Sequence, residues 1–515
     1  MRTERPMVAP TRRDILRTTL PLAVIAGVSL GLTPAPNEWG LLAYPGLAFL
    51  LFAVAPPGYL PSVRNGFIAG FVFSFLVNAV ALYWMVGLLE AFGGFPTVAA
   101  IPTAGLLFAA QALPMAVACA FAAALAQRRF PVWAVLPPLL TLFSDLAPTL
   151  FPWRLMHSQT GFPIWLQLAE IGGQPLLDLC LTYAAMGLGQ ALVHRDRRAA
   201  IIGVVALALP LAYGAYRIEE VRAERLVAPT LRIGVVQPNV SIQEKNNRDS
   251  APARLASLQE LTRDLESSGA DLVVWPETAY PYLLPRSWTR DSPGRWAILN
   301  RGAKGPLLVG TVTRDPDAGR YNSVVAVEAD GTFTATADKV ELLAFGEYVP
   351  LWDYLIPIQE YFPRGMTPGD APKVIEIAGA RVGVLNCYED VLAEYAILVG
   401  RDDPDVLVNV TNDAWFGHTT EPFGHEAQSR LRSIETRRDL VRAVNTGVSS
   451  HTSATGESLL QTQTFIRDAF IAEVRVLSEV TPWVRFGNWP RALLYGALLG
   501  LALAAQRRDL WARPR

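Results

Sequence analysis

Three residues with complementary chemistry each follow a strand-like run in the C-terminal half of the chain. They are Glu277, Lys339 and Cys387. A carboxylate can take the proton of a thiol as a general base, and an ammonium group can stabilise the oxyanion that forms when a carbonyl is attacked. Functional sites of α/β folds usually lie at such strand ends. The three residues therefore make chemical sense as a set, with Cys387 as nucleophile, Glu277 as general base and Lys339 as oxyanion partner.

The composition of the chain draws attention to two of these residues. Cys387 is the only cysteine outside an apolar segment, since Cys119 and Cys180 fall in membrane-like stretches and are expected to serve packing. Lys339 is one of only four lysines among 45 lysine and arginine residues. A Glu or Lys after a strand is usually a solvated surface residue, so position alone leaves that reading open.

The region 217–485 alternates strand-like and helix-like segments, which predicts a layered α/β fold with helices packed on a sheet. One helix is expected near 251–268 and a hairpin at 373–386. Further strands are expected at 231–237, 271–275, 306–311, 322–328, 332–338, 405–410 and 441–450.

The rest of the chain has the composition of a membrane protein. Of its 515 residues 51% are hydrophobic and 18% charged, and the formal net charge is -1, which argues against nucleic acid as a partner. Several of its apolar stretches approach the roughly 20 residues that cross a bilayer. These stretches are 20–33, 41–55, 66–89, 97–126, 131–151, 163–193, 199–216 and 489–505.

The apolar stretches predict a polytopic α-helical membrane domain with about eight transmembrane helices. The expected domains are an N-terminal membrane domain at 1–216, a catalytic α/β domain at 217–485, and a C-terminal transmembrane helix with its tail at 486–515. Arg12 and Arg13 before an apolar run also fit a twin-arginine export signal. A basic flank before a first membrane helix agrees better with the seven apolar segments that follow.

The loop charges orient this arrangement in the membrane. Basic residues cluster at both termini and in alternate loops, whereas Arg154 is the one clear exception on the other side. By the positive-inside rule, both termini are expected in the cytoplasm and the α/β domain on the opposite side of the membrane. The basic residues are Arg2, Arg5, Arg12, Arg13, Arg17, Arg64, Arg128, Arg129, Arg195, Arg197, Arg198, Arg507, Arg508, Arg513 and Arg515.

The residues that usually bind metals show no metal-binding pattern. The chain has no CxxC pair, and its five histidines lack the spacing of zinc ligands. We therefore expect neither a metal nor a cofactor. The histidines are His157, His194, His418, His425 and His451.

Motifs around the three candidate residues resemble the nitrilase superfamily. They are Trp275-Pro276-Glu277, Asp338-Lys339 with Phe345-Gly346-Glu347-Tyr348, and Asn386-Cys387-Tyr388-Glu389. Further motifs are similar to the membrane-bound branch of that superfamily, the apolipoprotein N-acyltransferases. These are Asn412-Asp413-Ala414-Trp415-Phe416-Gly417, a run from Arg432 to Gly447, and Phe151-Pro152-Trp153 in the membrane half. The resemblance implies an αββα sandwich that carries a Glu277–Lys339–Cys387 triad.

The resemblance also implies a two-step acyl transfer without a cofactor. Cys387 would attack the ester of a membrane phospholipid, typically phosphatidylethanolamine, and form a thioester. The acyl chain would then pass to the α-amino group of the diacylglyceryl cysteine that begins a lipoprotein. Lys339 and the backbone N–H of Tyr388 would hold the oxyanion. The implied setting is the inner membrane of a Gram-negative-type bacterium, with a monomeric enzyme whose catalytic domain faces the periplasm.

Further residues carry over from the family in supporting roles. Glu347, Tyr388 and Glu389 match residues around the triad, and ordinary structural roles are the alternative for each. Trp415 and Phe416 are candidates to line the entrance for the acyl chain or lipoprotein, with buried packing as the alternative.

Two aromatic stretches and two acidic residues complete the candidates. Trp352 and Tyr354 lie in one aromatic stretch, and 280–288 is another; either could form a mobile cover over an acyl site or pack on the core. Asp145 and Asp178 fall in membrane segments and are candidates for function by location, while pairing within the helix bundle explains them equally well.

Three other functions remain open from the sequence. A membrane-tethered amidase or nitrilase would use the same triad but pass the acyl group to water. A non-catalytic membrane protein could retain a nitrilase-like domain. An acyltransferase could act on a different amine.

Overall fold

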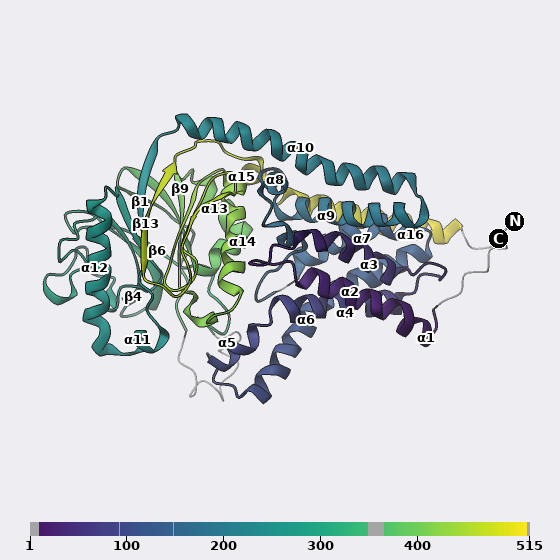
Figure 1. Cartoon of the computed structure of the whole chain (residues 1–515), viewed down its shortest axis with the longest axis horizontal. Helices are drawn as coiled ribbons and strands as arrows, with labels where there is room; N and C mark the ends of the chain where they lie inside the picture. The colour runs from purple at the N-terminus through teal and green to yellow at the C-terminus, as the bar shows by residue number, and fades with distance from the viewer. Residues whose placement is uncertain (1–9, 92, 148, 349–364, 512–515) are drawn as a thin grey trace. The chain divides into compact units, whose positions relative to one another are not determined.

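The chain folds into a helical unit and an α/β unit. The computed structural model describes residues 10–91, 93–147, 149–348 and 365–511. The helical unit comprises Met1–Arg217 and Asn488–Arg515, and the α/β unit comprises Ile218–Gly487. Figure 1 labels many of the elements of both units.

The helical unit consists of long apolar helices connected by short segments (Figure 1). Among the described residues, five helices are long and apolar enough to cross a membrane, and three shorter helices are also apolar. Each predicted apolar stretch lies on one or more of these helices. They are α2 (Leu20–Gly31), α3 (Ala43–Val54), α4 (Val63–Ala81), α6 (Thr97–Gln127), α7 (Val132–Leu146), α9 (Ala169–His194), α10 (Arg197–Val227) and α16 (Trp489–Trp511).

One predicted apolar stretch, 66–89, is not a single helix. Helix α4 ends at Ala81, and a short helix, α5 (Met85–Ala91), begins four residues later. Between the two helices Trp84 is buried and packs edge-on against Phe151, with 5.0 Å between the ring centroids. This aromatic contact uses the break in the helix, which hydropathy alone does not reveal.

The two acidic residues singled out in membrane segments both have partners within the helical unit. Asp145 on α7 forms ion pairs with Arg154, at 2.6 Å, and with Arg491 on α16. Asp178 on α9 accepts a hydrogen bond from the backbone N–H of Met156, at 2.7 Å. Arg154 is the residue that departs from the loop-charge pattern, and its pairing with Asp145 gives it a structural role.

The described residues of the α/β unit form two mixed sheets with a similar plan, in which three central parallel strands are flanked by antiparallel ones; in the first sheet the two-residue strand β3 adds a parallel pairing. The first sheet has the order β13-β1-β2-β4-β5-β6, and β3 pairs with β4. Its strands are β1 (Thr230–Gln237), β2 (Leu272–Trp275), β3 (Leu284–Pro285), β4 (Leu307–Asp315), β5 (Gly319–Val327), β6 (Phe333–Asp338) and β13 (Asp468–Arg475).

The second sheet has the order β12-β11-β10-β9-β8-β7, with β8, β9 and β10 parallel. Its strands are β7 (Val374–Ile377), β8 (Ala380–Asn386), β9 (Val406–Thr411), β10 (Leu440–Val444), β11 (Ser450–Thr452) and β12 (Ser458–Gln461). The parallel strands read as continuous apolar runs because both of their faces are buried.

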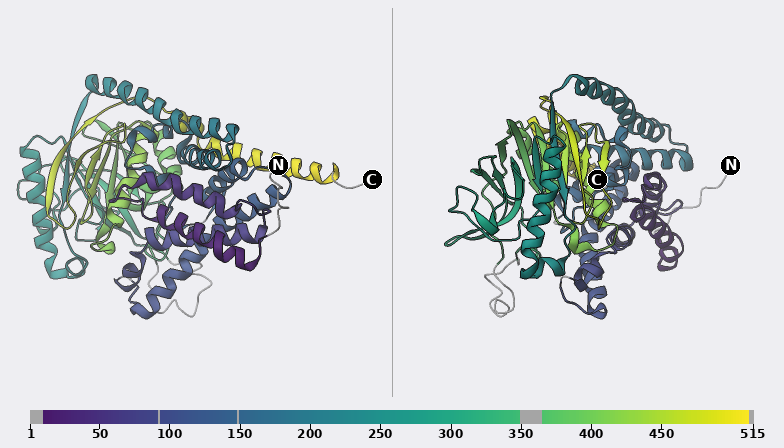
Figure 2. Two further views of the ribbon diagram at one scale, coloured as in Figure 1. Left: turned by 45° about the vertical axis from the view of Figure 1, so that its right-hand side comes forward. Right: turned by 60° about the vertical axis from the view of Figure 1, so that its left-hand side comes forward.

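The two sheets pack face to face and are covered on the outside by helices. Buried side chains of both sheets form one core cluster, which includes Val235, Val274, Leu308, Val384, Val408 and Val441. The alternate side chains of the first sheet, such as Trp275, pack under helix α12 (Ala251–Ser267). Helices α13 (Ala393–Arg401) and α14 (Glu421–Thr436) belong to the other side of the sandwich, as Figure 1 and the turned views of Figure 2 show. The architecture is the predicted nitrilase-like αββα sandwich.

The predicted strand at 441–450 is wrong as a single element. The structure has two antiparallel strands there, β10 and β11, separated by a turn that contains Asn445 and Gly447. Asn445 holds this turn because its side-chain amide donates hydrogen bonds to Asn412 Oδ1, at 2.8 Å, and to the carbonyl of Val240, at 2.7 Å. The Asn-Thr-Gly sequence is a turn signal inside an apolar run.

Candidate active site

The three residues of the predicted triad follow strands of both sheets. Glu277 comes after β2, Lys339 comes directly after β6, and Cys387 comes directly after β8. Glu277 and Lys339 are 7% and 2% exposed, and Cys387 is half-buried. Lys339 Nζ lies 3.6 Å from Glu277 Oε1, and the charge of the Cys387 thiolate would interact with both residues.

The turn that carries Glu277 is packed tightly against β4. Gly310 on β4 has no side chain at this contact, and a Cβ atom there would lie 2.9 Å from Glu277 Cα. Thr278 has a left-handed backbone conformation, with φ at 49°. Lys245 Nζ donates to Thr278 Oγ1 at 2.8 Å and to the carbonyl of Glu277 at 3.4 Å. Close packing and these hydrogen bonds fix the direction of the Glu277 side chain.

Lys339 is bonded more directly to a second carboxylate, Glu347. The distance from Lys339 Nζ to Glu347 Oε2 is 2.8 Å. Asn322 on β5 links both acidic residues, because its Nδ2 donates to Glu277 Oε1 at 2.6 Å and to Glu347 Oε1 at 2.9 Å. Its Oδ1 accepts from Asn386 Nδ2 at 3.1 Å, immediately before Cys387. Asn322 therefore connects the acid–base side of the site to the nucleophile turn.

Cys387 begins a short 3-10 turn, Cys387–Val391, at the end of β8. Its φ of 53° lies in the left-handed region, where a residue with a side chain is strained. Asn409 on the neighbouring strand β9 donates to the carbonyl of Cys387 at 3.1 Å. Glu389 closes the turn by accepting from the backbone N–H of Asn386 at 2.8 Å. This strand-to-turn junction holds the thiol at the sheet end in one conformation.

The electrostatics of the site keep the thiol protonated and the lysine charged. Burial, together with the charge of Glu277, raises the pKa of Cys387 to about 12, although the positive charge of Lys339 opposes the shift. Burial would lower the pKa of Lys339, but the charges of Cys387, Glu277 and Glu347 outweigh it and raise that pKa above its usual value. A thiol of this kind needs a base in contact with it at the moment of attack.

The supporting residues differ in what they contact. Glu347 pairs with Lys339, as described above. Glu389 is fully buried and accepts from the backbone N–H groups of Val340, at 2.7 Å, and Glu341, at 3.1 Å, so it joins the loop after Lys339 to the nucleophile turn. Burial raises the pKa of Glu389 to about 7 and that of Tyr388 to about 12.

The residues predicted to line a substrate path differ in their burial and in whether the structure describes them. Trp415 and Phe416 are half-buried in the turn after β9, and Trp352 and Tyr354 lie outside the described residues. In the aromatic stretch 280–288, Tyr280 and Leu284 are buried in the layer under α12. For these two residues the structure therefore agrees with the alternative of packing on the core.

Asn322 and Lys245 are site residues that the sequence reasoning missed. Asn322 is the first residue of a predicted strand, and a polar side chain beside an apolar run is the signal that could have drawn attention to it. Lys245 is one of only four lysines, and its interaction with the Glu277 turn depends on packing between distant segments.

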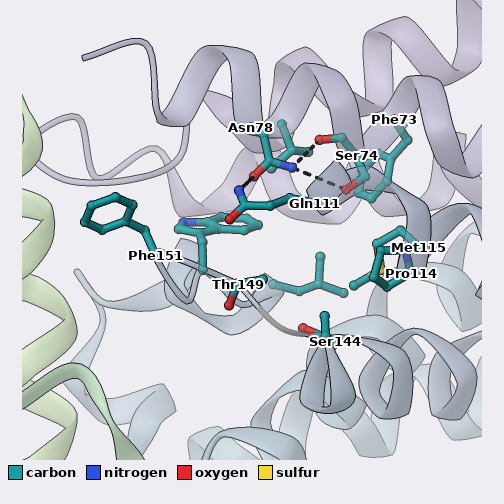
Figure 3. A pocket seen from close by; sticks show the side chains of 13 residues that line it. Phe73, Ser74, Asn78, Gln111, Pro114, Met115, Ser144, Thr149 and Phe151 are labelled. Carbon is teal, nitrogen blue, oxygen red and sulfur yellow. Dashed lines mark hydrogen bonds between the residues drawn. The ribbon is translucent and has the colours of Figure 1, made fainter. Parts of the chain in front are cut away.

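The helical unit contains a cavity of its own, drawn in Figure 3. Asn78 and Gln111 project into this region from α4 and α6, and Gln111 Nε2 donates to Asn78 Oδ1 at 2.9 Å. Asn78 Nδ2 in turn donates to the carbonyl of Ser74 at 2.8 Å, and Gln111 Oε1 accepts from the backbone of Leu150 at 3.3 Å. These amides therefore bond to the protein itself and tie α4, α6 and the segment after α7 together.

Comparisons with known proteins identify both halves of the chain. Residues 232–483 match the carbon-nitrogen hydrolase family, and residues 26–187 match the apolipoprotein N-acyltransferase N-terminal domain. An apolipoprotein N-acyltransferase from Azotobacter vinelandii is 32% identical over 95% of this chain and 95% of its own. The chain belongs to the apolipoprotein N-acyltransferase family.

A second relative agrees with this assignment. An apolipoprotein N-acyltransferase from Pseudomonas putida is 30% identical and covers 94% of this chain and 96% of its own. Among solved structures, a carbon-nitrogen hydrolase from Helicobacter pylori is 18% identical, with a TM-score of 0.36 over 47% of this chain and 88% of that one.

Membership of the family establishes the class of the protein. It is a multi-pass membrane protein with the acyltransferase family's carbon-nitrogen hydrolase domain as its catalytic part. Glu277, Lys339 and Cys387 all fall within residues 232–483, the range of that domain.

Proposed function

We propose that this protein transfers an acyl chain from a membrane phospholipid, through a thioester on Cys387, to the α-amino group of the diacylglyceryl cysteine that begins a lipoprotein. Phosphatidylethanolamine is the proposed donor. The observation that carries the proposal is the meeting of Glu277, Lys339 and the Cys387 turn, with a 3.6 Å contact between the first two. A base, a cation and a thiol in this arrangement suit acyl transfer.

The first step forms the thioester. Glu277 takes the proton of the Cys387 thiol as the sulfur attacks the ester carbonyl, because the raised pKa of the thiol leaves little thiolate beforehand. Lys339 stabilises the negative charge that develops on the carbonyl oxygen. The tetrahedral intermediate then expels the lysophospholipid oxygen, which takes the proton back from Glu277. The products are an acyl thioester on Cys387 and a lysophospholipid.

The second step transfers the acyl chain to the amine. The α-amino nitrogen attacks the thioester carbonyl and gives a proton to Glu277, while Lys339 again stabilises the oxyanion. Collapse of the intermediate breaks the carbon–sulfur bond, and the departing thiolate takes the proton from Glu277. Glu347 stays in contact with Lys339 at 2.8 Å, so the lysine keeps an anionic partner in both protonation states of Glu277.

We propose the inner membrane of a Gram-negative-type bacterium as the setting, with both termini in the cytoplasm and the catalytic domain in the periplasm. The distribution of basic residues among the loops supports this orientation. In this orientation the lipoprotein acceptors would meet the α/β domain on the periplasmic side of the membrane.

Product analysis distinguishes this function from a hydrolase. The purified protein is incubated with phosphatidylethanolamine in detergent micelles, with and without a synthetic diacylglyceryl lipopeptide. Acyl transfer predicts an N-acylated lipopeptide together with an equal amount of lysophospholipid. Free fatty acid that forms equally well without the lipopeptide would identify a hydrolase. The absence of both products would indicate a non-catalytic domain.

A further inference from the structure

A buried ionic cluster contacts the turn that carries Cys387 and has no part in the reaction steps above. We call Asp390, Asp413, His425 and Arg442 the histidine cluster. Asp390 lies three residues after Cys387 in the same turn, Asp413 follows β9, His425 is on α14 and Arg442 is on β10. All four residues are buried, and only His425 is measurably exposed, at 6%.

The two hydrogen bonds of His425 favour its protonated form. Its Nε2 lies 2.8 Å from Asp390 Oδ1, and its Nδ1 lies 3.2 Å from Asp413 Oδ1. Ionised carboxylates only accept hydrogen bonds, so both ring nitrogens must donate. An imidazole that donates from both nitrogens is the protonated imidazolium. Asp390 also pairs through its second oxygen with Arg442.

The charges around the histidine agree with that assignment. Burial would lower the pKa of His425, but the charge and the hydrogen bond of Asp413 outweigh it and raise the pKa to about 10. Burial and the charge of Asp413 raise the pKa of Glu421 to about 8, so this residue is mostly protonated at neutral pH. Two cations then balance two carboxylates, and the cluster keeps a positive group next to the nucleophile turn.

A metal ion is the other occupant that these residues could hold. Donor atoms of Asp413, Glu421 and His425 lie within 4.8 Å of one another, and Asp413 Oδ2 and Glu421 Oε2 have no hydrogen-bond partner. A metal would need an unprotonated ring nitrogen, however, and both nitrogens of His425 face carboxylate oxygens. The hydrogen-bond geometry therefore favours the imidazolium, and metal content becomes an outcome of the test.

We propose that His425 is a positioning residue, which as an imidazolium between Asp390 and Asp413 fixes the Cys387 turn and makes formation of the thiolate easier. This rests on the proposed role of Cys387 as nucleophile. Asp390 carries the mechanical link, since it shares the 3-10 turn with the cysteine. The electrostatic link is direct, since the charge of His425 lowers the pKa of Cys387 against the larger effect of burial.

The rate of thiol alkylation tests the proposal without acyl transfer. The substitution His425→Gln removes the charge but keeps one donor. Because the rate follows the fraction of thiolate, iodoacetamide should modify Cys387 about tenfold more slowly at pH 8 if the thiol's pKa rises by about one unit. The anionic reagent iodoacetate should slow still more, because a nearby positive charge has been lost. A loss of packing alone would slow both reagents equally.

His451→Gln is the matched control. His451 Nε2 lies 3.0 Å from Asp439 Oδ2, and this pair is also buried within the α/β unit but lies outside the Cys387 turn. His451→Gln should lose about as much stability as His425→Gln, and Cys387 should be alkylated at the wild-type rate. Equal rates in the wild type and His425→Gln, or equal slowing by both reagents, would overturn the proposal.

Asp413→Asn and elemental analysis complete the test. Asp413→Asn removes a negative charge that raises the pKa of Cys387, so it should not slow iodoacetate as His425→Gln does. A stoichiometric metal in the purified wild type, lost in either variant, would assign the histidine cluster to metal binding and contradict the imidazolium. Failure of the proposed acyl transfer would leave these alkylation results unchanged, so the two ideas fail separately.

Discussion

In each of two clusters of the α/β unit a cation lies between two carboxylates, but with different geometry; the histidine cluster also contains Arg442, which pairs with Asp390. In the lysine cluster (Glu277, Lys339 and Glu347), the ammonium lies 2.8 Å from Glu347 and 3.6 Å from Glu277. In the histidine cluster, the imidazolium has carboxylate oxygens at 2.8 and 3.2 Å, one on each ring nitrogen.

The difference separates a reactive arrangement from a supporting one. The loosely paired Glu277 keeps an oxygen that can take and return a proton, whereas the ring nitrogens of His425 are both used. The elements differ as well, because Lys339 and Glu347 flank a loop, while the histidine cluster joins a turn, a strand and a helix. The lysine cluster, in which Glu277 is only loosely paired, therefore fits a chemical role. The histidine cluster, in which both ring nitrogens of His425 are paired, fits a positioning role.

The largest loss of rate is expected when Glu277, the loosely paired carboxylate, is replaced. Glu277→Gln keeps the volume and can still bond to Asn322, but it cannot accept a proton from the thiol. Loss of a general base costs about 10²–10⁴-fold in rate. Thioester formation measured by rapid quench should fall by a factor in this range, and lipid binding should persist. A variant within about threefold of the wild type would contradict the base role.

A slightly smaller loss of rate is expected when Lys339, the cation that Glu277 and Glu347 share, is replaced. Lys339→Met removes the charge and should slow both steps about 10²–10³-fold, the loss typical of an oxyanion donor. Lys304→Met is a control at a lysine in an exposed loop and should have no effect. The measurement is kcat for lipopeptide acylation, and a rise in KM alone at Lys339→Met would argue for a role in binding instead.

Replacing Glu347, the carboxylate closest to Lys339, should reduce the rate less than replacing Glu277. Glu347→Gln leaves Lys339 next to Glu277, so the ammonium stays charged but loses its closest partner. We expect a decrease of about tenfold in kcat, equivalent to about 1.4 kcal/mol. The same assay checks it. If Glu347→Gln were as damaging as Glu277→Gln, the distinction between the two carboxylates would be wrong.

The smallest effects should appear in stability at two glycines near the histidine cluster. A Cβ atom at Gly447 would lie 2.8 Å from Asp413 Cβ, whereas one at Gly424 on α14 would meet open space. Gly447→Ala should therefore cost about 1–3 kcal/mol by overpacking. Gly424→Ala should stabilise by up to about 1 kcal/mol because it favours the helix. Thermal unfolding in detergent measures both, and equal midpoints would contradict the packing described at Asp413.

The sequence predicts most elements of the α/β unit because its parallel strands are continuous apolar runs. The triad could be proposed because Glu277, Lys339 and Cys387 each follow such a run and belong to recognisable motifs. Asn322 and Lys245 could not, since their importance depends on hydrogen bonds between segments far apart in the chain. His425 could not be recognised either, because its two carboxylate partners, Asp390 and Asp413, come from two other segments of the chain.

The most direct test of the central claim is the mass of the intact protein during a single turnover. Wild type incubated with phosphatidylethanolamine should gain the mass of one acyl chain, located on Cys387 by fragmentation, and addition of the diacylglyceryl lipopeptide should remove it. Cys387→Ser should show no thioester, that is, no adduct that neutral hydroxylamine releases. An adduct on another residue, or N-acylation of the lipopeptide by Cys387→Ser at the wild-type rate, would contradict Cys387 as the acyl carrier.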